Sequence, residues 1–328
     1  MGAIKKLLLA CLLTVSGFSY EVSDMLGEIT ASQKDPKIVF VGPGALRLGV
    51  YLGLEDNIVG IEAVEKQAPK ISPYREKINQ KGLIQKSLIV GQGGPGKLPS
   101  SEALISSGAT LIVASFINKN DVKMLKQQTN IPVFVVSYGE GYGGNSDKLE
   151  AIKESLLKLG EVTHKQARAK EIVNFMNRQS HELKELNLKP QSVYIGGMGY
   201  KGAQGITSTE SNYPPFELLG LENIFTKSVS GHLFVSLESI IEADPEAIFL
   251  DSLGKEIVKS EMESKKELFE LLSAYKNSKI FWLRAYNFYN TNIENVFICA
   301  WEIAKALGAE VDTKAKTDEI LKQFLDFK

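Results

Sequence analysis

The sequence contains few of the residue types from which most active sites are built. Its 328 residues include two cysteines and three histidines, and it has no HExxH, CxxC or GxSxG pattern. The carboxylates are scattered, and no nucleophile stands at a spacing that pairs it with a base. These absences favour a protein that holds a ligand over an enzyme.

An excess of positive charge is also missing. The formal net charge is −1, whereas non-specific binding to nucleic acid needs a basic surface that displaces counterions. We therefore expect no nucleic-acid partner. Hydrophobic residues make up 44% of the chain, which is enough apolar material for two cores.

The N-terminal apolar run is not long enough to be a transmembrane segment. Residues 7–15 are apolar and follow two lysines, but a run of this length cannot span a bilayer. Gly17 and Ser19 are small residues at the −3 and −1 places of a cleavage site. We predict that residues 1–19 are a signal peptide and that the protein is exported.

The cysteines allow a second interpretation of this segment. Residues 8–11 resemble a lipoprotein box ending at Cys11, which would carry a lipid anchor. The apolar core before Cys11 is unusually short, so we favour simple cleavage. Only Cys299 then remains, which leaves no intramolecular disulfide, and its apolar neighbours predict a buried, inert thiol.

Short apolar runs alternate with helical patterns twice along the chain. Continuous hydrophobicity is typical of parallel strands that are buried on both faces. Between the strands we expect a loop rich in Gly, Thr, Ser and Pro up to Pro215, and one charged helix over 256–275. The predicted strands are 38–41, 58–61, 88–90, 110–115 and 132–136 in the first set, and 192–195, 247–250 and 280–282 in the second.

A charged helical region separates the two sets of strands. Its second part, 165–186, is long enough to bridge two lobes, at roughly 30 Å. The sequence thus predicts an α/β fold: two Rossmann-like lobes with parallel sheets, joined by one long α-helix. The expected boundaries are a signal peptide at 1–19, an N-terminal lobe at 20–146, the helical region at 147–188 and a C-terminal lobe at 189–328.

Two glycine-rich motifs each lack a residue that nucleotide binding requires. Residues 91–97 match a phosphate-binding loop, but Leu98 replaces the Ser or Thr that ligates magnesium. Residues 42–44 resemble a dinucleotide fingerprint, but Arg47 replaces its third glycine. At the start of a helix, Arg47 is placed either to attract an anion or to form a surface salt bridge.

The segment from Trp282 to Asn295 is the strongest binding candidate. It carries one arginine, two tyrosines and four asparagines between a strand and a helix, and open α/β sheets bind ligands at such connections. A single tyrosine is more often a packing residue, but tyrosines recur at strand ends in both sets, and their rings suit a flat or anionic ligand. The selected ligand-binding residues are Arg47, Tyr138, Tyr200, Tyr213, Arg284, Tyr286 and Tyr289.

One histidine is a candidate metal ligand. His232 lies in a loop between expected elements of the second set, whereas the other two histidines lie on or beside the charged helix. With so few histidines and cysteines, the chain is not suited to coordinate a bare soft metal tightly.

Five segments carry a family resemblance that extends over nearly all the chain after the signal. They are I-V-F-V-G-P-G-A-L-R-L at 38–48, G-Q-G-G-P-G-K-L-P-S-S-E at 91–102, G-I-T-S-T-E-S-N-Y-P-P-F at 205–216, D-P-E-A-I-F-L-D at 244–251 and Y-N-F-Y-N-T-N-I-E-N at 286–295. In this order they resemble the helical-backbone (class III) periplasmic substrate-binding proteins of ABC importers for iron-siderophores, haem and cobalamin, in their iron-complex subgroup.

The resemblance implies a ligand between the lobes and a membrane permease as the partner. It implies that one glutamate of each lobe docks on permease arginines, and the matching residues are Glu102 and Glu238. These glutamates start equivalent helices of an internal repeat, 101–113 and 237–249. The alternative is that both only complement the helix dipole.

The favoured function is therefore a periplasmic, monomeric, non-enzymatic protein that delivers a metal chelate, with a ferric siderophore as the favoured cargo. No intrinsic cofactor is expected, since iron or another metal arrives within the chelate. Haem, cobalamin or a nickel complex is the alternative cargo, for which His232 would complete the coordination. The alternative from another class is an exported enzyme on the same scaffold.

Overall fold

The computed structural model describes residues 19–67, 72–94, 96–137, 148–189, 191–226, 231–285 and 292–326. Three of the selected tyrosines, Tyr138, Tyr286 and Tyr289, lie outside these residues, as does Cys11. Within them no helix combines the length and the apolar character that crossing a membrane requires.

The first lobe is built on a five-stranded parallel sheet in the order β5-β4-β3-β6-β7. All five strands predicted from apolar runs are present. Alternate residues of β3 enter different cores: Ile38 and Phe40 pack with one cluster, and Val39 and Val41 with the other. Burial on both faces explains why the runs are continuous. The strands are β3 (Ile38–Val41), β4 (Ile58–Glu62), β5 (Leu88–Gly91), β6 (Leu111–Ala114) and β7 (Val133–Val135).

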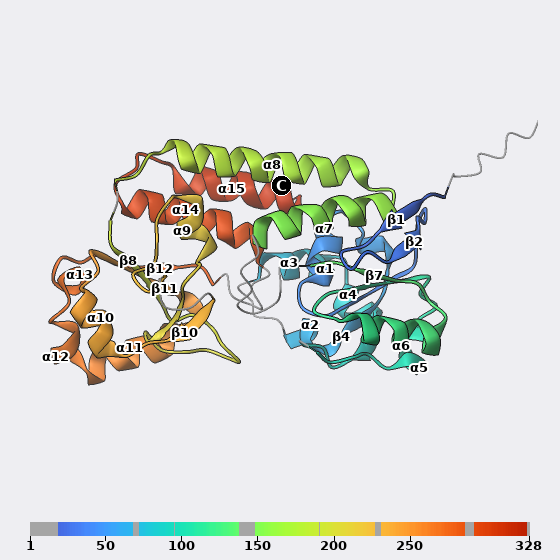
Figure 1. Ribbon diagram of the computed structural model, residues 1–328, viewed down its shortest axis with the longest axis horizontal. Helices are drawn as coiled ribbons and strands as arrows, with labels where there is room; N and C mark the ends of the chain where they lie inside the picture. Colours follow the sequence, from blue (N-terminus) through green and yellow to red (C-terminus); the bar gives the residue numbers. More distant parts are fainter. Residues whose placement is uncertain are drawn as a thin grey trace, which may run out of the picture.

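Helices cover both faces of this sheet (Figure 1). An antiparallel hairpin of β1 and β2, which the sequence did not predict, lies at the edge beside α7. The remaining first-lobe elements are β1 (Glu21–Ser23), β2 (Ile29–Ala31), α1 (Ala45–Tyr51), η1 (Glu55–Asn57), α2 (Ala63–Gln67), α3 (Pro73–Gln80), α4 (Leu83–Lys86), α5 (Ser101–Ser106), α6 (Lys119–Thr129) and α7 (Lys148–Val162).

The second lobe contains a three-stranded parallel sheet in the order β12-β11-β8. Its strands β8 (Val193–Gly196), β11 (Ala247–Asp251) and β12 (Ile280–Leu283) are the three predicted ones. The segment expected as a loop up to Pro215 instead contains β9 (Ser208–Glu210), which pairs with β10 (His232–Phe234) in a two-stranded antiparallel sheet. Three-residue strands are too short for a period of two to be recognised.

The prediction of one charged helix over 256–275 is wrong. Lys265 has φ −120° and ψ 31°, outside helical geometry, and it interrupts the segment. The Asp244 carboxylate then accepts from the Ser273 backbone N–H at 2.7 Å, which fixes a new helix start. The helices of the second lobe are α9 (Pro214–Leu218), α10 (Leu237–Ala243), η2 (Ser252–Gly254), α11 (Lys255–Ser264), α12 (Lys266–Phe269) and α13 (Ser273–Lys276).

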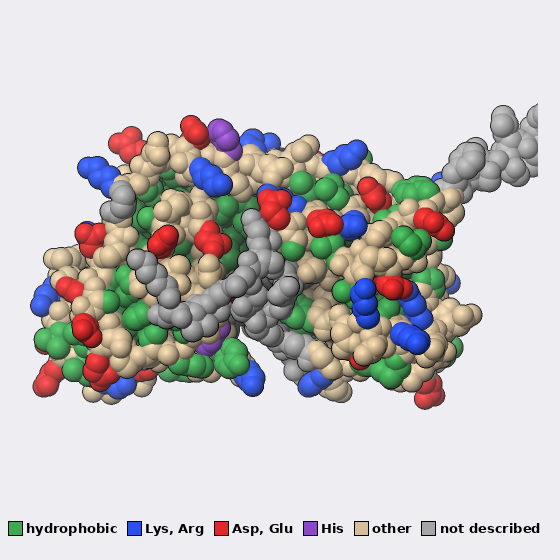
Figure 2. All heavy atoms as spheres, in the orientation of Figure 1, with side chains coloured by type: hydrophobic (Ala, Val, Ile, Leu, Met, Phe, Trp, Pro, Cys, Tyr) green, Lys and Arg blue, Asp and Glu red, His purple; other side chains and the backbone are tan. Residues whose placement is uncertain are grey.

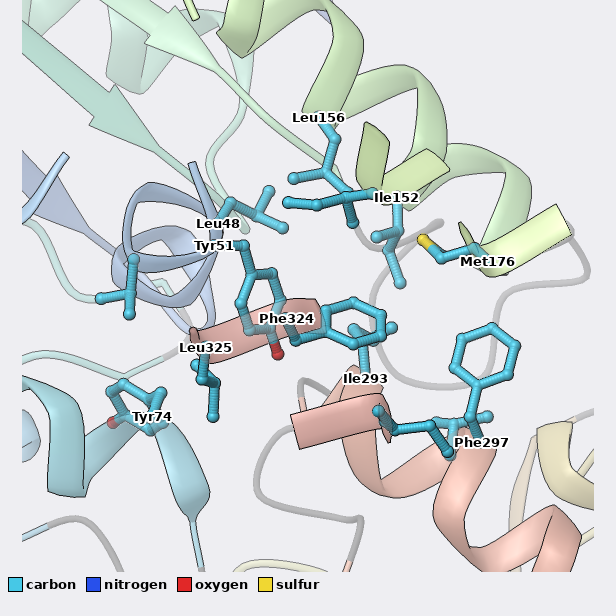
Figure 3. Packing of buried hydrophobic residues seen from close by; sticks show 14 of the residues in the cluster. Leu48, Tyr51, Tyr74, Ile152, Leu156, Met176, Ile293, Phe297, Phe324 and Leu325 are labelled. Carbon is cyan, nitrogen blue, oxygen red and sulfur yellow. The ribbon is translucent and has the colours of Figure 1, made fainter. Parts of the chain in front are cut away.

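Three helices join the lobes along one side of the molecule (Figure 1). The predicted long helix is α8 (Gln166–Glu185), and α14 (Ile293–Ala306) and α15 (Thr313–Leu325) lie beside it. Although the expected boundaries assign α15 to the C-terminal lobe, it packs on first-lobe helices: the Phe324 ring lies 5.0 Å from that of Tyr51 (Figure 3). The lobes thus share one apolar core.

Candidate functional site

The first-lobe side of the candidate site begins where neighbouring strands of the five-stranded sheet end. The Gly42 N–H donates to Glu62 Oε2 at 2.9 Å, and Ser115 Oγ donates to the Pro43 carbonyl at 2.6 Å. Gly42 has φ +82°, and a Cβ there would lie 2.2 Å from the Ser115 carbonyl oxygen, so the turn requires glycine. Burial raises the pKa of Glu62 to about 7, against the opposing effect of the Gly42 hydrogen bond.

Arg47 is buried beside this turn rather than exposed at the surface. Its side chain is 1% exposed, and its guanidinium carbon lies 4.2 Å from the centre of the Tyr74 ring. The Tyr74 hydroxyl donates to Glu65, which is also buried. Burial by itself would lower the pKa of Arg47, but the surrounding phenols and carboxylates, Glu65 among them, raise it. The guanidinium therefore balances charge inside the protein.

The same cluster reaches the second half of the chain. Glu294, in the first turn of α14, is fully buried and accepts a hydrogen bond from the Tyr51 hydroxyl of α1. Burial raises the pKa of Glu294, while Tyr51 and Arg47 act in the opposite direction. We call Arg47, Glu62, Glu65 and Tyr74 the first-lobe wall, and Glu294 joins this wall to α14.

Asn292 and Asn295 stand at the start of the same helix. Asn292 is the N-cap residue of α14, but its side chain makes no capping hydrogen bond. Its side chain is fully buried, and neither its oxygen nor its nitrogen has a partner among the residues that the structure describes. Asn295 donates to the Ala285 carbonyl at 2.7 Å. A buried amide without partners is costly, so the Asn292 side chain is a local source of instability at the start of α14.

The second-lobe side presents an aromatic cluster around His232. The Tyr200 and His232 rings are stacked, with centroids 4.4 Å apart, and Phe234 meets both rings edge-on. Phe234 is 58% exposed, which is unusual for phenylalanine. Figure 1 shows β10 on the side of the second lobe that faces the first lobe. We call Tyr200, Ser208, His232 and Phe234 the second-lobe wall.

Ser208 determines which ring nitrogen of His232 is available. The Ser208 hydroxyl donates to the Met198 carbonyl, and its oxygen lies 2.8 Å from His232 Nε2. Since a hydroxyl has one hydrogen, Nε2 must donate to Ser208. Burial lowers the pKa of His232, with Glu210 acting in the opposite direction, so the ring is neutral at pH 7. The lone pair then stands on Nδ1, for which the described residues supply no hydrogen-bond partner.

Two other selected residues are held by contacts within the protein. Tyr213 is 1% exposed, and its ring packs against Phe216 with centroids 5.1 Å apart. Arg284 is exposed, and its Nε lies 3.3 Å from Glu302. The structure thus brings His232 next to Tyr200, places Arg47 in a buried charge cluster of the first lobe, and leaves Tyr213 in the core. Direct ligand contact by any of the selected residues stays a prediction.

The free thiol has no role in either wall. Cys299 is fully buried in α14, and burial raises its pKa well above the ordinary range. Its sulfur donates weakly to the Arg284 carbonyl at 3.4 Å. A buried and inert thiol was the prediction, and the surroundings of Cys299 confirm it.

The internal repeat is reproduced in the capping of two helices. Ser100 accepts from the Ala103 N–H ahead of α5, and Ser236 accepts from the Ser239 N–H ahead of α10. Glu102 and Glu238 therefore occupy the same helical position in the two lobes, and both are exposed. Equivalent, exposed carboxylates are available to a partner.

Metal-ligating and charged side chains are spread out over the part of the chain that the structure describes and the face shown in Figure 2. Over the described ranges, no group of three His, Cys, Asp or Glu side chains could hold a metal ion. Figure 2 shows acidic and basic side chains interspersed over one face of the molecule.

Comparison with known proteins gives a consistent picture. The sequence model of a family described as "Periplasmic binding protein" matches residues 38–286. A search of curated proteins finds no match. The solved structures it resembles include Haemophilus influenzae MolA bound to molybdate, with a TM-score of 0.73 and 16% identity over 94% of this chain and 98% of that chain.

Two further solved structures are similar. An ABC-type Fe3+-hydroxamate transport protein from Saccharomonospora viridis has a TM-score of 0.62 and 18% identity, covering 89% of this chain and 100% of that chain. Helicobacter pylori Ceue with Ni(II) bound has a TM-score of 0.69 and 16% identity, covering 94% and 97%. At these identities the likeness shows a shared fold.

Proposed function

The chain belongs to the periplasmic binding protein family, whose members bind small molecules for ABC importers, and we propose that its cargo is a metal chelate held between the two lobes. The favoured cargo is a ferric siderophore. The protein would be exported by its signal peptide, work in the periplasm as a monomer, and pass the chelate to an inner-membrane permease.

The second-lobe wall is the observation that carries this proposal. The stacked Tyr200 and His232 rings and the exposed Phe234 present aromatic faces, which suit the flat, partly apolar surface of an organic chelate. The Nδ1 lone pair of His232 adds one donor that a coordinatively unsaturated metal accepts. One histidine is too few to hold a bare metal, which favours a metal that arrives with its own ligands.

The remaining selected residues complete the proposed site. Arg47, within the first-lobe wall, would neutralise the negative charge of the chelate through the buried cluster. Arg284 would neutralise it from the other end of the Trp282 to Asn295 segment. Tyr138, Tyr286 and Tyr289 would supply further rings. Tyr213 would support the second lobe from within its core.

A haem, cobalamin or nickel complex is the second candidate cargo. His232 favours it, because imidazole nitrogen is a good ligand for nickel, iron and cobalt. The similar Helicobacter pylori structure was solved with Ni(II) bound. An exported enzyme on this scaffold is less favoured. The Ser208 hydroxyl lies beside His232, but it donates its proton to the Met198 carbonyl and accepts from Nε2, so the imidazole is not placed to activate it as a base.

Native mass spectrometry of the protein purified from its own periplasm tests the cargo directly. We expect a one-to-one adduct whose mass and isotope pattern give iron together with an organic chelator. A nickel or cobalt pattern, or the mass of haem, would select the second candidate. An organic adduct that is chemically converted during incubation with the protein would contradict the binding role.

Docking on the permease is tested separately from binding. We propose that Glu102 and Glu238 contact permease arginines, so Glu102→Ala combined with Glu238→Ala should abolish uptake and leave cargo affinity unchanged. The matched control is Glu267→Ala with Glu270→Ala, which removes two exposed carboxylates elsewhere on the second lobe. A fall in affinity in the double variant would place the pair in the binding site instead.

A further inference from the structure

A buried ion pair connects the two lobes at the second-lobe wall. Lys148, the first residue of α7, lies against Glu210, the last residue of β9, and their side chains are 11% and 2% exposed. Helix α7 belongs to the first lobe by its contacts, because Ser155 accepts from the Ser137 N–H and Lys158 donates to the Ser23 carbonyl. The pair is therefore a contact between lobes.

Glu210 is firmly attached to the second lobe. It pairs in register with His232 across the two-stranded β9–β10 sheet. The Asn223 amide donates to the Glu210 carbonyl at 2.9 Å and to Thr209 Oγ1 at 2.8 Å, and Asn223 is itself buried. The backbone of Glu210 is thus fixed, so a movement of Lys148 away from it requires a change in the spacing of the lobes or of the α7 start.

A charged contact differs from the apolar packing that joins the lobes elsewhere. The attraction within a buried ion pair is largely offset by the loss of hydration of both charges. When such a pair separates into water, each charge regains its hydration, whereas separated apolar surfaces have no compensation. The shared core around Phe324 is therefore a permanent joint, and the Lys148 to Glu210 contact is suited to break and form again.

We propose that Lys148 and Glu210 form a breakable latch between the lobes that positions the β9–β10 sheet, with His232 on it, against the first lobe. The latch acts without cargo, and its effect on capture rests on the proposed binding function. Loss of Lys148 leaves Glu210 buried without its cation and lets the second-lobe wall move away from the first.

Spin-label distance measurements test the latch without any cargo. Labels at Lys123→Cys on α6 and Lys265→Cys beside α11 report the spacing of the lobes, and Cys299 is too buried to compete for label. We expect a single narrow distance distribution in the parent, and a broader or longer one in both Lys148→Met and the isosteric Glu210→Gln. The swapped pair Lys148→Glu with Glu210→Lys should restore a distance distribution close to that of the parent.

Lys153→Met is the matched control. Lys153 lies on the same helix with the same 11% exposure, but its partner Glu150 is on α7 itself. Its distribution should match the parent. An unchanged distribution in Glu210→Gln, or a swapped pair as broad as the single variants, would overturn the latch.

The effect on capture is measured with ferric tris(acetohydroxamate) as the probe. We expect Lys148→Met and Glu210→Gln to weaken its binding by roughly fivefold or more, as for two coupled sites, and Lys153→Met to leave it unchanged. A parent that does not bind this probe would count against a hydroxamate cargo, while the distance measurement would still decide the latch. Equal probe affinities in the parent and in the latch variants would show that the latch has no role in cargo capture.

Discussion

The two walls of the candidate site use polar residues in opposite ways. In the first-lobe wall, Arg47, Glu65 and Tyr74 are buried and satisfy one another, so their charges are compensated inside the protein. In the second-lobe wall, His232 is half-buried, and one of its nitrogens has no hydrogen-bond partner among the residues that the structure describes. The first wall is built to be rigid, whereas the second is built to contact something else.

The largest expected effect concerns the first wall. Arg47→Met removes the cation that compensates Glu65 and Glu294, and an uncompensated buried charge costs about 3–5 kcal/mol. Calorimetric unfolding should show a loss of this size. Arg284→Met is the control, because its exposed pair with Glu302 should contribute only about 0–1 kcal/mol. Similar losses in both variants would show that the first wall is not a buried charge cluster.

A pH titration of stability separates Glu62 from its neighbours. Burial raises its folded pKa from 4.5 to about 7, so the folded state keeps a proton that the unfolded state loses. The contribution is fully present below pH 4.5 and is lost as the pH rises to about 7, a change of about 3 kcal/mol. Glu62→Gln should therefore gain stability relative to the parent as the pH rises from 4 to 8, measured by urea unfolding. A constant difference across this range would refute the raised pKa.

His232 tests the second wall. His232→Ala should weaken binding of the cargo identified by mass spectrometry by about tenfold or more, which is at least about 1.4 kcal/mol. The free energy of unfolding should change little. Calorimetric titration measures the affinity, and His181→Ala, an exposed histidine on α8, is the control. If His232→Ala destabilised the fold as much as Arg47→Met, the two walls would not differ in kind.

The smallest effect concerns the tautomer of His232. Ser208→Ala removes the acceptor of the Nε2 proton, so the proton can move to Nδ1. Nitrogen chemical shifts of the imidazole should report Nε2–H in the parent and a mixture in the variant. Affinity should fall by about 1 kcal/mol or less, consistent with the loss of one hydrogen bond. A parent protein in which His232 is already protonated on Nδ1 would contradict the assignment of the Nε2–H tautomer.

Secondary structure was predictable where an element carries a continuous apolar run. All eight parallel strands were found in this way. β3 is buried on both faces, which leaves the uninterrupted run at 38–41, whereas β5 and β12 keep an apolar run although they are only partly buried. The β9–β10 sheet was missed because each strand has only three residues, with polar members such as Ser208 and Glu210. The separate helix start at Ser273 depends on Asp244, which is distant in sequence, so local propensity could not reveal it.

The candidate site was only partly predictable, for a related reason. Tyr200 and His232 were selected separately, but nothing in their spacing shows that their rings stack. Arg47 was selected for its charge, and the carboxylates that surround it, Glu65 and Glu294, come from segments far along the chain. A residue type indicates which chemistry is available, and its neighbours decide whether that chemistry is already used within the protein.

The sequence by itself determined the family, the two α/β lobes and the helix between them, because periodicity and motif order are local properties of the chain. Only the tertiary structure decided how the selected residues are used. It enclosed Arg47 among carboxylates, stacked His232 on Tyr200, and joined the lobes through Lys148 and Glu210. Charge compensation and ring packing depend on which distant segments meet, and that is settled only when the chain folds.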